Sequence, residues 1–179
     1  MRNQLTNRLS INNIYSLCLQ TQGKENNCLK EELYRLTLDE NDRVATNALW
    51  TFTHFDEANN EWLISKHDDL IDRVLIENNE TKSRLILSLL LRQPFEKDIL
   101  RSDFIDFCIA KITASSQPYA IRCYCMKLAY EQMKYYPELL TELKAALDML
   151  EQEVLSPGLL SAKKQIMKKI MRSLGHFGK

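Results

Sequence analysis

The chain has 179 residues, of which 45% are hydrophobic and 27% charged, a composition that is ordinary for one globular domain with its own core. Lys plus Arg (24) equals Asp plus Glu (24), and this zero net charge gives no general attraction to nucleic acid or to an anionic membrane. With four glycines and four prolines, the chain lacks the turn residues that an all-β or α/β fold needs, so we predict an all-α protein.

Apolar periodicity and helix-stop signals predict a series of helices joined by short connections. In chain order they cover residues 4–20, 26–38, 41–55, 60–77, 80–92, 102–114, 118–134, 137–153 and 157–174. Ser156 before Pro157 is typical of a helix start, Pro118 and Pro137 fit the same first helical position, and Gly175 fits a helix C-terminus. No linker divides the chain, which indicates one domain.

The five cysteines form no CxxC motif and no Cys/His cluster, so we predict buried thiols, no metal site and no cofactor. The N-terminal segment MRNQLTNRLSINNIY has no signal-peptide core, and the longest apolar run, residues 85–91, is too short to span a bilayer. We therefore expect a cytoplasmic protein.

A two-helix unit repeats along the chain. When Arg43, Arg84, Arg122 and Lys164 are taken as a common origin, they are spaced by 41, 38 and 42 residues. The second, third, sixth and seventh positions after each origin are mostly apolar and predict one buried helix face. A weaker register among the intervening helices aligns residues 70–71, 104–105 and 139–140. The predicted unit is therefore two antiparallel helices, repeated every 38–42 residues.

This repeat resembles HEAT and armadillo-type helical repeats over roughly residues 40–174. The first helix of that family often has a Val-Arg pair followed by small and leucine positions, and Ile121-Arg122 with Cys125 and Leu128 is similar to it. The resemblance implies a right-handed superhelix of about four antiparallel helix pairs plus a C-terminal capping helix.

Within a single solenoid domain of residues 1–179, we expect three parts. Residues 1–38 would be an atypical N-terminal helix pair, residues 40–155 the helix-pair repeats, and residues 156–174 a basic amphipathic capping helix.

Arg43, Asn47, Trp50 and His54 are spaced 4, 3 and 4 residues apart, so they lie on one side of their helix. One interpretation is a binding stripe, in which a tryptophan is flanked by hydrogen-bond donors. The other is that Trp50 packs between repeats, because its equivalents are Leu91, Ala129 and Met171.

The basic residues Arg43, Arg84, Arg122 and Lys164 would form a ladder along the repeats, and two interpretations of it remain open. The ladder could bond to carbonyls or carboxylates of the adjacent repeat, or it could be a positive track for an acidic partner. Residues 157–179, which include Lys164 and Lys168, contain six basic residues and no acidic one. This last helix could complement the acidic segment 131–153, or it could dock on nucleic acid, an acidic protein or a membrane surface.

We find no catalytic motif, so we predict no catalytic residues and a non-enzymatic protein. The first functional hypothesis is a helical-repeat scaffold that binds another protein or a peptide segment. The alternative is a nucleic-acid-binding protein of the DNA-repair type, similar in principle to HEAT-type alkylpurine DNA glycosylases, which would use the Arg ladder and the Lys-rich last helix. The sequence leaves the oligomeric state open.

Overall fold

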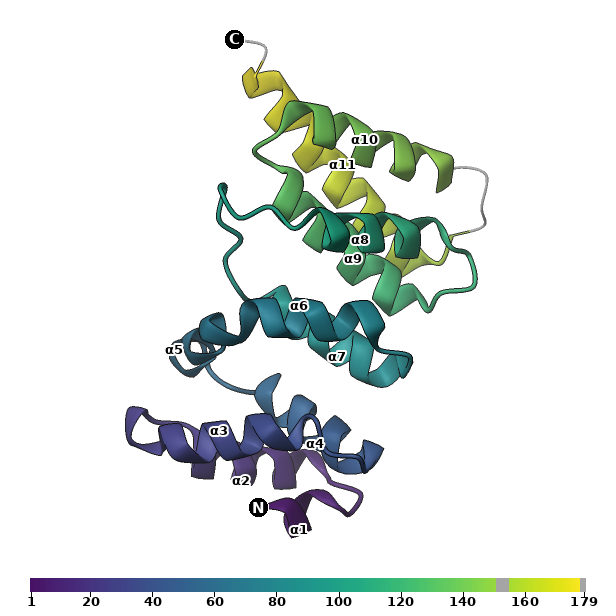
Figure 1. Ribbon diagram of the computed structural model, residues 1–179. Helices are drawn as coiled ribbons and strands as arrows, with labels where there is room; N and C mark the ends of the chain where they lie inside the picture. Colours follow the sequence, from purple (N-terminus) through teal and green to yellow (C-terminus); the bar gives the residue numbers. More distant parts are fainter. Residues whose placement is uncertain (151–154, 178–179) are drawn as a thin grey trace. The chain divides into compact units, whose positions relative to one another are not determined.

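The computed structural model describes residues 1–150 and 155–177, and its regular elements there are all helical (Figure 1). This confirms the predicted all-α class. The chain divides into two compact units, Met1–Gln93 and Pro94–Lys179, which are described separately below. The single solenoid domain of residues 1–179 stays a prediction.

The first unit consists of helices in two layers. Helices α2, α4 and α7 pack successively on one another, while α3 packs on α2 and α4, and α6 packs on α7. The elements of this unit are α1 (Arg2–Leu5), α2 (Ile11–Thr21), the 3-10 helix η1 (Lys24–Asn26), α3 (Asn27–Leu36), α4 (Asp42–Phe52), α5 (Glu57–Asn60), the 3-10 helix η2 (Glu61–Lys66), α6 (His67–Ile76) and α7 (Glu80–Leu90). The two layers correspond to the two helix sets of the predicted repeat.

Two predicted helices of this unit are interrupted. The helix expected over residues 4–20 is divided into α1 and α2, because Ser10 forms a capping box. The Ser10 hydroxyl oxygen accepts from the Asn13 N–H, and the Asn13 side chain accepts from the Ser10 N–H. The helix expected over residues 60–77 begins as α5 and η2, and only its second half is the regular helix α6.

The second unit consists of α8 (Ser102–Thr113), α9 (Tyr119–Met133), α10 (Pro137–Met149) and α11 (Pro157–Phe177). Helix α9 packs against the other three, and α10 also packs against α8 and α11. The capping serine is confirmed, since the Ser156 hydroxyl accepts from the Leu159 N–H. The expected end of a helix at residue 153 lies outside the described residues.

The proline and glycine signals predict some of the helix ends correctly and others wrongly. Pro137 occupies the predicted first turn of α10, whereas Pro118 is the residue before α9 rather than its first residue. The expectation for Gly175 was wrong, because α11 continues through it to Phe177. A glycine favours a helix end only where the chain needs a left-handed conformation, and Gly175 does not adopt one.

The predicted buried face is confirmed in part, since three of its four positions are buried in α7 and in α9. The sixth position is completely buried in all four aligned helices, at Leu49, Leu90, Leu128 and Ile170. The seventh position is not a general core position, since Trp50 is half-buried and Met171 is 57% exposed. In α4 and α7 the first, second, fifth and sixth positions are all buried, and so is Leu87 at the third position of α7. The eight residues at the four shared positions are Val44, Ala45, Ala48, Leu49, Leu85, Ile86, Leu89 and Leu90. Successive residues on a helix are about 100° apart, and a stripe of neighbouring apolar positions does not define the direction of the buried face to within one residue.

Candidate functional site

Helix α4 begins at Asn41, whose side-chain oxygen accepts from the backbone N–H groups of Arg43 and Val44. Trp50 lies in the last turn of α4, His54 lies two residues beyond the helix end at Phe52, and both side chains are half-buried. The His54 ring meets the Trp50 ring edge to face with centroids 5.9 Å apart, and it meets the Tyr15 ring of α2 in the same way at 5.6 Å. A histidine thus lies between two aromatic rings on α2 and α4.

The hydrogen bond of His54 defines which of its nitrogens is available. Its Nδ1 lies 3.0 Å from the Trp50 carbonyl oxygen, and because a carbonyl only accepts, Nδ1 is the protonated nitrogen. With Nδ1 protonated, an imidazole ring that holds a single proton has Nε2 as an acceptor. The His54 side chain is therefore fixed in position by α4 and offers one acceptor.

Asn47 has a structural part in the same helix. Its side chain is only 7% exposed, and its amide nitrogen donates to the carbonyl oxygens of Leu5 (2.8 Å) and Asn7 (3.0 Å). Both amide hydrogens are used, so Asn47 fastens the segment after α1 to α4 and presents no donor to solvent.

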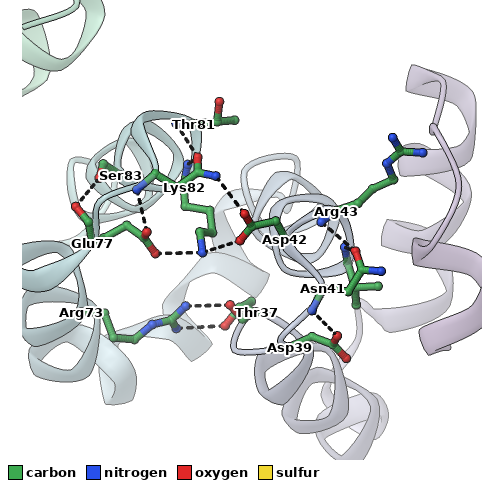
Figure 2. Close-up of polar contacts among 12 residues, drawn as sticks. Thr37, Asp39, Asn41, Asp42, Arg43, Arg73, Glu77, Thr81, Lys82 and Ser83 are labelled. Atoms are coloured by element: carbon green, nitrogen blue, oxygen red, sulfur yellow. Dashed lines mark hydrogen bonds and ion pairs between the residues drawn. The ribbon is translucent and has the colours of Figure 1, made fainter.

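Arg43 is exposed, and in Figure 2 its guanidinium extends away from the neighbouring network of charged side chains. Arg84 occupies the equivalent place in α7 and is half-buried. Within residues 1–150 and 155–177, neither guanidinium makes a hydrogen bond or an ion pair. The first unit therefore offers two arginine side chains on successive helices of one layer.

The aligned basic residues of the second unit, Arg122 and Lys164, differ in their burial. Arg122 is 1% exposed, and its Nε donates to the Ile112 carbonyl oxygen at 2.9 Å, which joins α9 to the end of α8. Lys164 and Lys168 of α11 are both exposed. The four aligned residues thus range from buried to exposed, and Arg122 acts as a structural link.

The turns that lead into α4 and α7 share a polar arrangement that the sequence analysis missed (Figure 2). Asp39 accepts from the Asn41 N–H, and Glu77 accepts from the Asn79 N–H in the same way, both through one carboxylate oxygen. Asn79 then caps α7 as Asn41 caps α4. The signal for this turn is an acidic residue two positions before a capping asparagine, and it recurs after 38 residues.

Lys82 joins the two turns. Its ammonium group lies 2.8 Å from the Asp42 carboxylate and 3.3 Å from the Glu77 carboxylate. Hydrogen bonding to Lys82 holds the pKa of Asp42 below its usual value, and hydrogen bonding to Asp42 raises the pKa of Lys82. Lys82, two residues before the aligned Arg84, is therefore a basic residue that bonds across to the adjacent repeat, as Arg73 does through Thr37.

We expect the Lys82→Met variant to lose more stability near neutral pH than in acid. Because the folded-state pKa of Asp42 is depressed, its contribution is present above the unfolded pKa of about 3.9 and is lost as the pH falls through the folded value. Urea midpoints of the wild type and variant at both pH values measure the difference. Lys24→Met, which removes an exposed lysine, is the control and should show no such dependence. A Lys82→Met effect of equal size at both pH values would contradict the assignment.

The cysteines differ sharply in their surroundings. Burial raises the pKa of the Cys18 thiol to about 11, and burial with hydrogen bonding between the two thiols raises the pKa of Cys108 beside Cys125. Cys123 is half-buried, and Cys28 on α3 is exposed.

We expect Cys28 to be the first thiol modified by Ellman's reagent in the native protein, because it is the one exposed thiol among the described residues. Cys18, Cys108 and Cys125 should react only after unfolding. Absorbance at the released thiolate band follows the reaction, and Cys28→Ser should remove its fast phase. A fast phase that persists in Cys28→Ser would show that a thiol described as covered is open to solvent.

In the described chain, the carboxyl groups with a shifted pKa all have it lowered, and they are Asp39, Asp42, Asp56 and Asp103. Their principal hydrogen-bond donors are Arg2, Lys82, the Asn59 backbone and Arg101. These are the shifts of exposed ion pairs and helix caps. Among the described residues, no group of three or more His, Cys, Asp or Glu side chains could hold a metal ion.

Repeated pairs of antiparallel helices, stacked in two layers and joined by matching turns, define a helical-repeat protein. A family model described as a HEAT repeat domain matches residues 1–170, and the chain belongs to this family. This confirms the family that the sequence resembles. Proteins of this family often serve as helical scaffolds in protein interaction.

No curated protein matches the chain, and no solved structure matches it. None of the helices in residues 1–150 and 155–177 combines the length and the apolar character that crossing a membrane requires.

Proposed function

We propose that the protein is a non-enzymatic, cytoplasmic scaffold that holds a segment of another protein on the surface of α4 and α7. The partner surface consists of Arg43, Trp50 and His54 of the α4 region and Arg84 of α7. The observation that carries the proposal is a half-exposed tryptophan, fixed beside His54 and aligned with two arginines whose side chains have no bonding partner in the described part.

These residue types suit protein recognition. Tryptophan and arginine are the residues most enriched among the few that dominate binding energy at protein interfaces. Arg43 and Trp50 are seven residues apart on one helix, which separates them by about 10 Å along its axis. The partner segment that fits this spacing has an acidic side chain for Arg43 and an apolar side chain for Trp50, with a polar hydrogen for His54 Nε2.

The test is comparative affinity capture from native cytosol, with the wild type, Trp50→Ala, Arg43→Glu and a matched control. Arg35→Glu serves as the control because Arg35 is an exposed arginine on α3, in the other layer. A partner of this surface should be lost with Trp50→Ala and Arg43→Glu and retained with Arg35→Glu. Its binding should then be measured with purified proteins, where at least a tenfold loss is expected for Trp50→Ala. Identical captured sets for all four proteins would overturn the proposal.

A second candidate function, nucleic-acid binding, is favoured by one observation on α11. This helix has no acidic residue, and it exposes Lys164, Lys168, Lys169 and Arg172. Because Arg122 is buried, this candidate depends on α11 rather than on a continuous ladder. Fluorescence anisotropy with labelled duplex DNA and single-stranded RNA should show salt-dependent binding that weakens in Lys164→Gln/Lys168→Gln. Absence of binding at low salt would exclude this candidate.

A further inference from the structure

Helix α2 differs from the other long helices in its charge. Its eleven residues, INNIYSLCLQT, include no charged side chain, whereas each other described α-helix of ten or more residues contains at least two. Its solvent side consists of uncharged polar residues such as Asn12, Ser16 and Gln20. Helix α11 is the contrast, since its exposed side is rich in lysine, as expected for a helix that faces water.

One flank of α2 is apolar and exposed. Ile11, Tyr15 and Leu19 follow one another at intervals of four residues and are 41%, 52% and 79% exposed. At this spacing they form one continuous strip next to the buried residues of the same helix. The apolar part of α2 is thus wider than the part that α3 and α4 cover, and such a strip is the mark of an interaction surface.

We infer that the occupant of this α2 flank, defined as Ile11, Tyr15 and Leu19, is the same flank of a second copy of the chain. The inference goes beyond the proposed partner surface, which uses other residues. When a helix without charged side chains packs against its own copy, no like charges face each other. A charged partner would form no ion pair with such a helix. The flank is also symmetric about Tyr15, with one aliphatic residue four positions to either side.

This symmetry defines a register. In an antiparallel pair of α2 helices related by a twofold axis, Tyr15 packs on Tyr15 of the other copy at the axis, and each Ile11 packs on the Leu19 opposite. The His54 ring, which already contacts Tyr15 edge to face, holds the tyrosine in place for this contact.

The size of the flank predicts the strength of the dimer. Helix α2 is about 16 Å long, so two such helices bury less than the roughly 1,200 Å² at which stable interfaces begin. We therefore expect a weak and concentration-dependent dimer, with a dissociation constant in the range of about 10 μM to 1 mM.

Sedimentation equilibrium over this concentration range tests the inference. The mass of the wild type should rise from 21.0 kDa toward twice that value, while Leu19→Glu should stay monomeric and retain the circular dichroism of the wild type. Leu160→Glu is the matched control, because Leu160 is an exposed leucine of α11, and it should dimerise as the wild type does. A wild type that stays monomeric throughout the range overturns the inference, and so does a Leu19→Glu variant that dimerises normally.

Disulfide mapping tests the register in a Cys28→Ser background. Tyr15→Cys should form a covalent dimer under a glutathione redox buffer, since the two sulfurs meet at the axis. Ile11→Cys alone should not, because its two copies lie about 12 Å apart along the helices, but a mixture of Ile11→Cys and Leu19→Cys should. Equal crosslinking of all three single variants would indicate a parallel pair and overturn the antiparallel one. If the flank instead takes a different protein, Leu19→Glu will lose a captured partner while the wild type stays monomeric alone, which overturns the inference without affecting the Trp50 surface.

Discussion

Replacing Arg122 by alanine is expected to destabilise the second unit by about 3 kcal/mol. The side chain is among the largest fully buried ones, and its Nε donates to the Ile112 carbonyl oxygen. The substitution leaves this carbonyl without that donor and opens a cavity between α8 and α9. Urea unfolding followed by far-ultraviolet circular dichroism measures the loss.

Two further variants separate the causes. Arg122→Met restores most of the volume without the donor, so its effect should be about half that of Arg122→Ala. Arg84→Ala removes the aligned arginine of α7, which is half-buried and makes no hydrogen bond or ion pair in the described chain, and it should cost less than about 0.5 kcal/mol. Equal effects at Arg84 and Arg122 would contradict the structural role given to Arg122.

Replacing Asn47 by leucine is expected to destabilise the first unit by about 2–3 kcal/mol, because the carbonyls of Leu5 and Asn7 both lose their donor. The segment of residues 1–9 should also become accessible to limited proteolysis before the rest of the unit. Trp50 and Trp62 both lie in the first unit, so tryptophan fluorescence reports its unfolding directly. Thr46→Ala, at the neighbouring half-buried position, is the control and should change stability little.

Asn47→Asp gives a sharper form of the same test. A carboxylate would face the two carbonyl oxygens, which raises its folded-state pKa above the unfolded value of about 3.9. The variant should therefore be nearly as stable as the wild type in acid, where the protonated carboxyl donates to one carbonyl. It should lose stability as the pH rises above the unfolded pKa, until the folded value is passed. A loss that does not depend on pH would indicate that Asn47 matters only through its shape.

Much of the helical architecture could be predicted from the sequence, because periodicity and helix starts are local signals. The predicted segments 80–92, 102–114 and 118–134 end within two residues of α7, α8 and α9. The interruption between α1 and α2 depends on Ser10 and Asn13, a capping pair that differs from the usual Ser/Thr with Glu/Gln. If asparagine is accepted at the position of Glu/Gln in the capping box, Ser10 and Asn13 predict the start of α2 correctly.

The environment of each candidate residue could not be predicted from its register. Arg43, Arg84 and Arg122 are equivalent in the repeat, yet they are exposed, half-buried and buried. The difference arises because Arg122 bonds to the end of α8. This contact joins two helices, and residue spacing along one helix does not predict it. Asn47 similarly gains its partners from the segment after α1, forty residues earlier in the chain.

The turns before α4 and α7 have a consequence for how such a chain grows. In each turn, side chains only a few residues away accept hydrogen bonds from backbone N–H groups at the start of the helix. Lys82 then forms an ion pair with Asp42 at the preceding turn. A duplicated segment of 38 residues, from one capping asparagine to the next, would therefore bring its own helix start and its own acidic residues, Asp42 and Glu77, but Val44 would stand at the position of Lys82. A repeat added at this point would thus have its helix start capped from the outset, and it would need a further substitution to gain the lysine bridge.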